Sequence, residues 1–210
     1  MAELSRSTGV PVATIKYYLR EGLLPRGEVT TSPNQASYGE AHVRRLALVR
    51  SLVEVGGLSI AAVGAVLAAV DDPSVGLHDT LGLTIDAAQA PAVPVDDAFH
   101  AEAADRIDAL IAERGWQLSP DPAARRAAIG VLATMRQVTG DRLTGLASVY
   151  AEAAELVAEA DLDTVTALAD PEARVETALV GTVLGERLLA ALRRLAQEHV
   201  SAHRFPRESS

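Results

Sequence analysis

The first apolar pattern in the chain predicts a short helix that begins near residue 12. Val12, Ile15 and Leu19 recur at steps of three and four, the spacing that places side chains on one helical face. Gly22 and Pro25 follow, which favours a helix end at this point. The opposite face carries small, polar or cationic residues: Ala13, Lys16, Tyr17 and Arg20, with Thr14 beside them. We therefore expect one buried stripe and one exposed face able to form hydrogen bonds.

A sharp turn is predicted immediately before this helix. Gly9 supplies the positive φ that such a turn needs, and Pro11 suits a first helical position, where its missing N–H has no partner to lose. Ala2 to Ser5 begins an amphipathic helix on the other side of the turn. Two helices joined by a glycine turn form a helix-turn-helix, and the exposed face of the second has the side chains that dock on DNA.

These residues resemble the DNA-binding domain of the MerR family of transcription regulators. The family's hallmark stands here as Thr8-Gly9-Val10, Thr14-Ile15-Lys16-Tyr17-Tyr18 and Gly22-Leu23-Leu24-Pro25. The similarity continues through Tyr38, a helix over 40–55, the break Gly56-Gly57-Leu58-Ser59 and the helix after it. It covers roughly residues 1–70, a third of the chain.

The resemblance implies a winged helix-turn-helix that binds a palindromic operator as a dimer. It implies a two-stranded wing over 28–38 and DNA contacts from Ala13, Thr14, Lys16, Tyr17, Tyr18, Arg20, Tyr38 and Arg44. In relatives, an effector changes the twist of promoter DNA so that RNA polymerase engages it, which makes the polymerase an implied partner. Two positions depart from the family pattern: Lys16 replaces an arginine, and Ala36 stands where an arginine usually grips phosphate.

The two helices that complete this region have different patterns. In the helix over 40–55, Val43, Leu46, Val49 and Val53 point inward, and we expect Arg44 and Arg45 to point outward. The helix from Ile60 to Val70 is apolar on all sides. A helix of that kind is normally buried all round, so we expect the C-terminal region to cover it.

The rest of the chain reads as helical. Helices are predicted at about 78–89, 96–114, 121–139, 141–160 and 171–200, with an extended linker at Ala90-Pro91-Ala92-Val93-Pro94. The predicted fold class is all-α with a small two-stranded β wing. The predicted divisions are a DNA-binding domain at 1–72, a connecting segment at 73–95, a helical effector-binding and dimerisation domain at 96–204, and a disordered tail at 205–210.

The last predicted helix has more apolar surface than one neighbouring helix can cover. Gly181 and Gly185 form a strip of small residues that permits close approach of a second helix. Leu188 and Leu192 lie further along the same face of the predicted helix. Two interpretations stand at this point: a homodimer interface formed by these four residues, or close packing within one chain. The family's usual dimerisation helix, directly after the DNA-binding domain, is interrupted here by Gly76, Gly82, Pro91 and Pro94.

Charge and cysteine content narrow the function classes. Residues 1–70 hold seven basic and five acidic residues, whereas 71–210 hold 12 basic and 23 acidic ones. This asymmetry fits one part that faces phosphate and another that does not. With no cysteine in the chain, thiolate sensing of soft metals, iron–sulfur clusters and thiol redox are excluded.

No catalytic or cofactor motif is apparent. The chain has no phosphate-binding glycine loop and no nucleophile elbow, so we expect a non-enzyme without a cofactor or metal. His199 and His203 could share a metal, but no third ligand is indicated. A signal peptide is not evident, and the longest apolar run, Ile60 to Val70, has 11 residues, against the roughly 20 that span a bilayer. We expect a cytoplasmic protein with no membrane partner.

Three aromatic residues are candidates for an effector site. Phe99, Trp116 and Tyr150 are the only large aromatics between the wing and the tail, and they could line a cavity for a small organic molecule of cationic or amphipathic character. Ordinary core packing is the alternative for these side chains. The functional alternative to a ligand-controlled regulator is a DNA-bound assembly or partner-recruiting protein without a small ligand.

Overall fold

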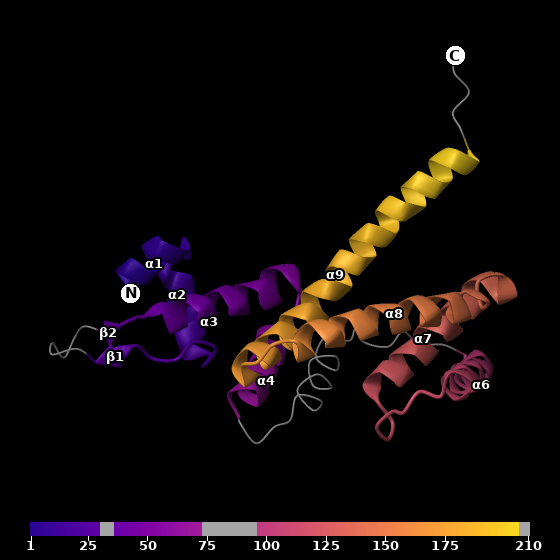
Figure 1. Cartoon of the computed structure of the whole chain (residues 1–210), viewed down its shortest axis with the longest axis horizontal. Helices are drawn as coiled ribbons and strands as arrows, with labels where there is room; N and C mark the ends of the chain where they lie inside the picture. The colour runs from indigo at the N-terminus through magenta and orange to yellow at the C-terminus, as the bar shows by residue number, and fades with distance from the viewer. Residues whose placement is uncertain (30–35, 73–95, 206–210) are drawn as a thin grey trace, which may run out of the picture. The chain divides into compact units, whose positions relative to one another are not determined.

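The computed structural model describes residues 1–29, 36–72 and 96–205 (Figure 1). Across these ranges the chain is mainly helical, which confirms the predicted class in its main feature. The chain divides into two compact units: unit 1 comprises Met1–Gly76 with Leu179–Ser210, and unit 2 comprises Leu77–Ala178. The expected boundary at residue 72 lies near the first of these limits. The last helix, however, is shared, because its part from Leu179 onward groups with unit 1.

Unit 1 begins with two short helices joined at a glycine. α1 spans Ala2–Thr8 and α2 spans Val12–Arg20. Gly9 between them has φ +69°, the left-handed conformation that the sequence predicted, and Gly22 after α2 has φ +74°. Leu4 of α1, Val10 of the turn and Ile15 of α2 are buried, so an apolar cluster holds the two helices together.

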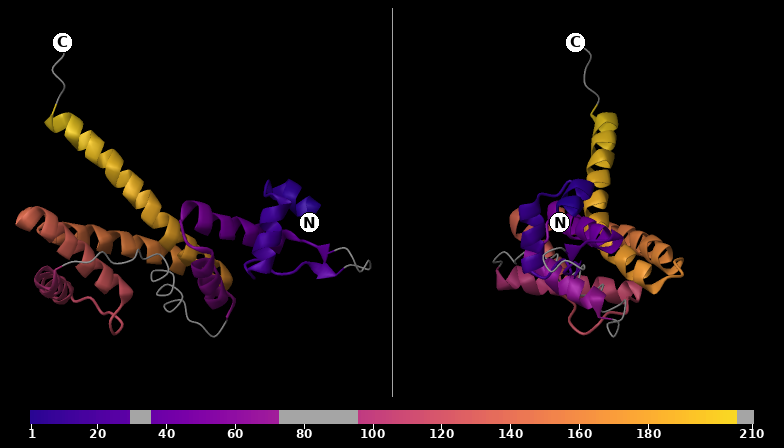
Figure 2. Two further views of the ribbon diagram at one scale, coloured as in Figure 1. Left: turned by 180° about the vertical axis from the view of Figure 1, so that it is seen from behind. Right: turned by 90° about the vertical axis from the view of Figure 1, so that its left-hand side faces the viewer.

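Two short strands follow α2. β1, Glu28–Val29, pairs antiparallel with β2, Ala36–Ser37, and Glu28 lies opposite Ser37. Figure 2 shows this pair beside the cluster of α1, α2 and α3. The tip of the predicted wing, 30–35, lies outside the described residues, and the wing as a DNA-binding element stays a prediction.

The helix predicted over 40–55 has two parts. α3, Glu40–Arg50, is α-helical, and η1, Ser51–Val55, is a π-helical turn that ends at the Gly56-Gly57 break. Leu46, Leu48, Val49 and Leu52 are buried along this segment. A wider π turn shifts the helical register by one residue, which the even apolar spacing of the sequence did not indicate.

α4, Ile60–Asp71, is correctly placed, but the expectation that it is buried on every side is wrong. Val63, Val66, Leu67 and Ala69 are buried, whereas Ala61, Ala65 and Ala68 are exposed. At 3.6 residues per turn these three alanines share one face. Alanine adds little apolar area, so its exposure costs little, and its high helix propensity explains its presence.

Unit 2 contains α6, Asp97–Arg114, α7, Ala123–Thr139, the 3₁₀ turn η2, Gly140–Arg142, and α8, Leu146–Thr166. α6 and α7 share an apolar core formed by Ala103, Ile107, Ile129, Leu132 and Ala133. These bounds agree with three of the predicted helices, although η2 and a turn delay the start of α8. The helix expected at 78–89 lies outside the described residues.

α9, Pro171–Arg204, is one unbroken helix of 34 residues (Figure 1). It starts in unit 2 and continues into unit 1. In unit 1 its Leu179 and Val183 are buried, and beyond Gly185 its described residues are exposed.

Candidate nucleic-acid interface

The buried stripe of α2 differs from the predicted one. Ile15 is fully buried and Tyr18 is only 4% exposed, whereas Val12 and Leu19 are half-buried. The ring of Tyr18 therefore lies in the core of unit 1, and its role as a DNA contact stays a prediction. Burial, with the negative charge of Glu54 as the second cause, raises the pKa of Tyr18.

The remaining predicted contacts of α2 share the other face. Ala13, Lys16 and Arg20 are exposed, and Thr14 and Tyr17 are half-buried. The Arg20 guanidinium lies 5.1 Å from the centre of the Tyr17 ring, and its Nε is 3.3 Å from a Glu21 carboxylate oxygen. This face combines two cations, a phenol and a small residue, the combination that can approach a phosphate backbone closely.

A histidine that sequence reasoning missed holds the start of α3. The Gly39 N–H donates to Nδ1 of His42 at 3.2 Å, so a neutral His42 ring carries its proton on Nε2. That nitrogen lies 3.4 Å from the main-chain oxygen of Arg26. The Tyr38 ring packs edge-on against His42 at 5.1 Å. His42 therefore connects the residues after α2 to those after β2. Its place as the third residue of α3, a common helix-capping position, was the feature of the sequence that could have predicted this role.

The two arginines of α3 have different environments. Arg44 is exposed as predicted and pairs with Glu40 at 3.2 Å, one turn earlier on the helix. Arg45 was also expected outward, and this is wrong, because its side chain is only 15% exposed. Its Nε donates to the Leu23 main-chain oxygen at 3.1 Å, and its two terminal nitrogens bind the Asp71 carboxylate at 2.8 and 2.5 Å. Arg45 thus fixes the exit of α2 against the end of α4.

Besides Arg6 of α1, four exposed cations lie on or next to α2 and α3: Lys16, Arg20, Arg26 and Arg44. Lys16 and Arg20 project from α2, Arg26 follows it, and Arg44 belongs to α3. They are positioned by buried neighbours such as Ile15 and Leu46. Such a set can neutralise several phosphates, which supplies affinity, while the tip of α2 can reach base edges.

The three aromatic candidates in unit 2 have different environments. Phe99 packs against the α6–α7 core. Trp116, just after α6, donates from Nε1 to a Glu155 oxygen at 3.1 Å, and Arg114 binds the other Glu155 oxygen at 2.6 Å. Tyr150 is exposed on α8. The Trp116 hydrogen bond, followed by the one from Arg114, lowers the pKa of Glu155.

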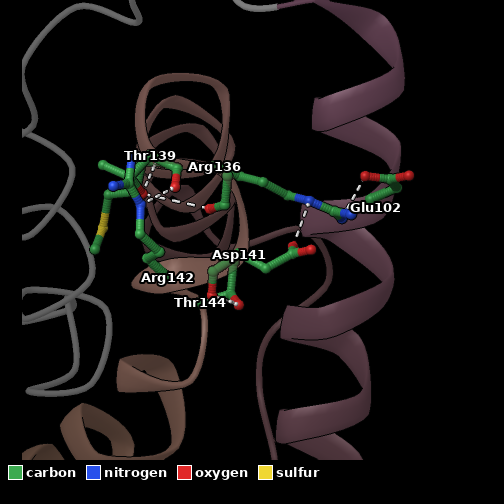
Figure 3. A network of polar contacts seen from close by, with 8 residues as sticks. Glu102, Arg136, Thr139, Asp141, Arg142 and Thr144 are labelled. Atoms are coloured by element: carbon green, nitrogen blue, oxygen red, sulfur yellow. Dashed lines mark hydrogen bonds and ion pairs between the residues drawn. The ribbon is translucent and has the colours of Figure 1, made fainter.

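A cavity of about 560 Å³ lies elsewhere in unit 2, and the three aromatics are not among its lining residues. Its walls are Glu102, Ala103, Asp105, Arg106, Ala109, Leu132, Arg136, Asp141, Thr144 and Gly145. Arg136 lies between Glu102 and Asp141 and forms ion pairs with both carboxylates (Figure 3). The sequence pattern did not indicate a cavity lined by both charged and apolar residues, because these residues come from three different elements.

The four predicted interface residues lie on one side of α9. A Cβ built on Gly181 or Gly185 would meet no described atom within 4 Å. These glycines are therefore not points of close packing within the described part of the chain. Leu188 is 60% exposed and Leu192 is 51% exposed.

Two further expectations concern metals and membranes. The rings of His199 and His203 are tilted at 55° with their centres 4.4 Å apart, and His203 Nδ1 is 2.9 Å from the His199 main-chain oxygen. Within the described ranges, no group of three or more potential metal ligands comes together. In the same ranges, every helix is too short or too polar to span a bilayer.

Comparisons with known proteins extend the resemblance to the whole chain. The model of the family described as "MerR HTH family regulatory protein" matches residues 1–70. Among solved structures, the "putative transcriptional regulator SCO5550 from Streptomyces coelicolor A3(2)" is 37% identical, with a TM-score of 0.70. The alignment covers 100% of this chain and 99% of that one. The curated proteins gave no match.

Proposed function

We propose, from the premise that the chain belongs to the MerR family of helix-turn-helix regulatory proteins, that it is a homodimeric, sequence-specific regulator of transcription. The observation that carries the proposal is the division of α2 into a buried face, Ile15 and Tyr18, and an exposed face with Lys16 and Arg20. A helix anchored in this way presents a fixed set of donors and cations to DNA.

In the proposed complex, α2 enters the major groove and the β1–β2 pair follows the phosphate backbone. Lys16 and Arg20 reach base edges or phosphates from α2, and Arg44 and Tyr38 contact the backbone beside the strands. Ala36 offers no cation at the position where relatives use an arginine. We therefore expect a larger share of the affinity to depend on the cations of α2 and α3.

The proposed dimer interface is a heptad seam on α9. Gly181, Gly185, Leu188, Leu192, Leu195 and His199 alternate at steps of four and three, which is the spacing of a coiled-coil core. Leu195 is 63% exposed in the single chain. The opposite side of the helix carries Leu179 and Val183, which are buried in unit 1, so the seam is left for a second subunit.

Side-chain size favours an antiparallel arrangement of the two α9 helices. If the pair is centred on Ala190, Leu188 of one subunit meets Leu192 of the other. In the same register, Gly185 meets Leu195 and Gly181 meets His199. Each small residue then faces a large one, whereas a parallel pair would place glycine against glycine and leave gaps.

We also propose that a small organic effector bound in unit 2 controls DNA binding. The support is the cavity in that unit and the continuity of α9 from unit 2 into unit 1. A continuous helix can transmit a change at one end to the other, provided that the ligand binds two conformations unequally. A DNA-bound assembly protein without an effector remains the competing proposal.

The proposal is tested by selecting bound sequences from a random duplex pool with the full chain. We expect enrichment of one palindromic sequence. Mass measurement of the protein on that duplex should give two chains per operator. Enrichment of no sequence, or one chain per site, would contradict the proposal.

A further inference from the structure

Arg106 differs from the other arginines of α6 and α7 in its partners. Arg114, Arg125, Arg126 and Arg136 each pair with at least one carboxylate. Arg106 donates from one terminal nitrogen to the Ser148 hydroxyl at 2.9 Å, and among the described residues it has no carboxylate within ion-pair distance. A guanidinium has five N–H donors, so most of its hydrogen-bonding capacity remains available.

The remaining N–H donors of Arg106 matter because the residue lines a cavity. The residue is half-buried and lines the 560 Å³ cavity, whose volume falls in the range of sites for small organic ligands. Ala103 and Leu132, both buried, give the cavity an apolar floor. A half-buried charge without a counterion is costly, and an anionic ligand would supply that counterion.

The other charges of the cavity limit the kind of anion. Glu102 and Asp141 are both held by Arg136, which links α6, α7 and η2 (Figure 3). Asp105 is exposed at the cavity wall, and no ion pair of it occurs among the described residues. This carboxylate repels any anion, but it is exposed, so water screens its charge more than that of half-buried Arg106. The other lining arginine, Arg136, is already paired, so a second ligand carboxylate would have no cation to bind. The site therefore suits one negative charge on an apolar body better than two.

We propose that this cavity binds a small organic monocarboxylate, with the ligand carboxylate paired to the free N–H groups of Arg106 and its apolar part on Ala103 and Leu132. The inference rests on the proposed effector control, for which it names the site and the ligand class. It differs from the aromatic set Phe99, Trp116 and Tyr150, none of which lines this cavity, and it names an anionic ligand in place of the expected cationic one.

The test compares ligands that share a body and differ in the polar group. Hexanoate, octanoate and benzoate are titrated against the full-length protein beside the matching amines and alcohols, with adipate as the dicarboxylate. Binding is measured by ligand-observed NMR and by the shift of the melting temperature. We expect the monocarboxylates to bind at least about tenfold more tightly than the matching alcohols, because a charge-assisted hydrogen bond is stronger than a neutral one.

Variants of Arg106 test whether this residue binds the ligand carboxylate. R106Q should lose the preference for carboxylates over alcohols, R106K should retain part of it, and R126Q, which removes an arginine outside the cavity, should behave as wild type. Melting curves of all variants without ligand report whether each folds. The inference is overturned if carboxylates bind no better than alcohols or amines, or if R106Q and R106K both keep the wild-type preference. Specific operator binding is measured without ligand on the same samples, so a failure here is distinguishable from a failure of the DNA-binding proposal.

Discussion

Arg187 donates a hydrogen bond of 2.7 Å to the main-chain oxygen of Gly56, and so fastens α9 to the end of the π-helical turn 131 residues away in sequence. One turn earlier on α9, Val183 packs on the same glycine. The contact brings the helix that we propose as dimer interface directly onto the DNA-binding region.

Gly56→Ala should destabilise the protein. A Cβ at this position would overlap Cγ1 of Val183 and lie 2.6 Å from the Leu52 main-chain oxygen, so the backbone must shift. We expect a loss of about 1–3 kcal/mol in the free energy of unfolding, measured by urea denaturation. Gly130→Ala on α7 is the control, because a Cβ there meets no described atom within 4 Å, and it should be neutral or stabilising. Equal effects of the two changes would refute the packing at Gly56.

Arg45→Met and Arg44→Met should separate stability from DNA binding. Losing Arg45 leaves the Leu23 oxygen and the Asp71 carboxylate without their donor, so we expect a stability loss of about 1.5–3 kcal/mol. Losing exposed Arg44 should leave the melting temperature nearly unchanged and weaken operator binding. A stability loss from Arg44→Met as large as that from Arg45→Met would show that our distinction is wrong.

Lowering the pH should change the fluorescence of Trp116, the only tryptophan in the chain, because its Nε1 donates a hydrogen bond to Glu155. Because hydrogen bonds lower the folded-state pKa of Glu155 below its ordinary value, its contribution to stability is present above that ordinary value. The contribution is lost as the pH falls through the lowered pKa. We expect a change in Trp116 fluorescence across this acidic range, and Glu155→Gln should abolish it. A transition that persists unchanged in Glu155→Gln would belong to another group.

Disulfide crosslinking can establish the direction of the α9 pair, since the natural chain has no cysteine. In the antiparallel register, Leu188→Cys protein mixed with Leu192→Cys protein should form a crosslinked heterodimer on mild oxidation. A parallel pair would instead crosslink each variant to itself. Val131→Cys, exposed on α7, controls for random collision. If the α9 variants crosslink no faster than this control, the dimer interface does not lie on α9.

The outer face of α2 was predictable from sequence because apolar spacing separates the two sides of an isolated helix. Tyr18 was not, since a tyrosine fits either the core or a wet surface, and only the packing of neighbouring elements decided its position. Arg45 escaped prediction for a related reason. Its partners, Leu23 and Asp71, come from distant parts of the chain, and periodicity along α3 holds no information about them. The Arg106 cavity likewise depends on three elements that meet only in the fold.

The central claim, that the exposed face of α2 recognises DNA, is tested most directly by titrating the selected operator with Lys16→Ala protein. We expect operator affinity to fall by about 5- to 150-fold, which corresponds to roughly 1–3 kcal/mol for a charged or base-reading contact. Arg126→Ala removes an exposed arginine of α7 and should bind as the wild type does. Unchanged affinity of Lys16→Ala, or an equal loss in Arg126→Ala, would contradict the account.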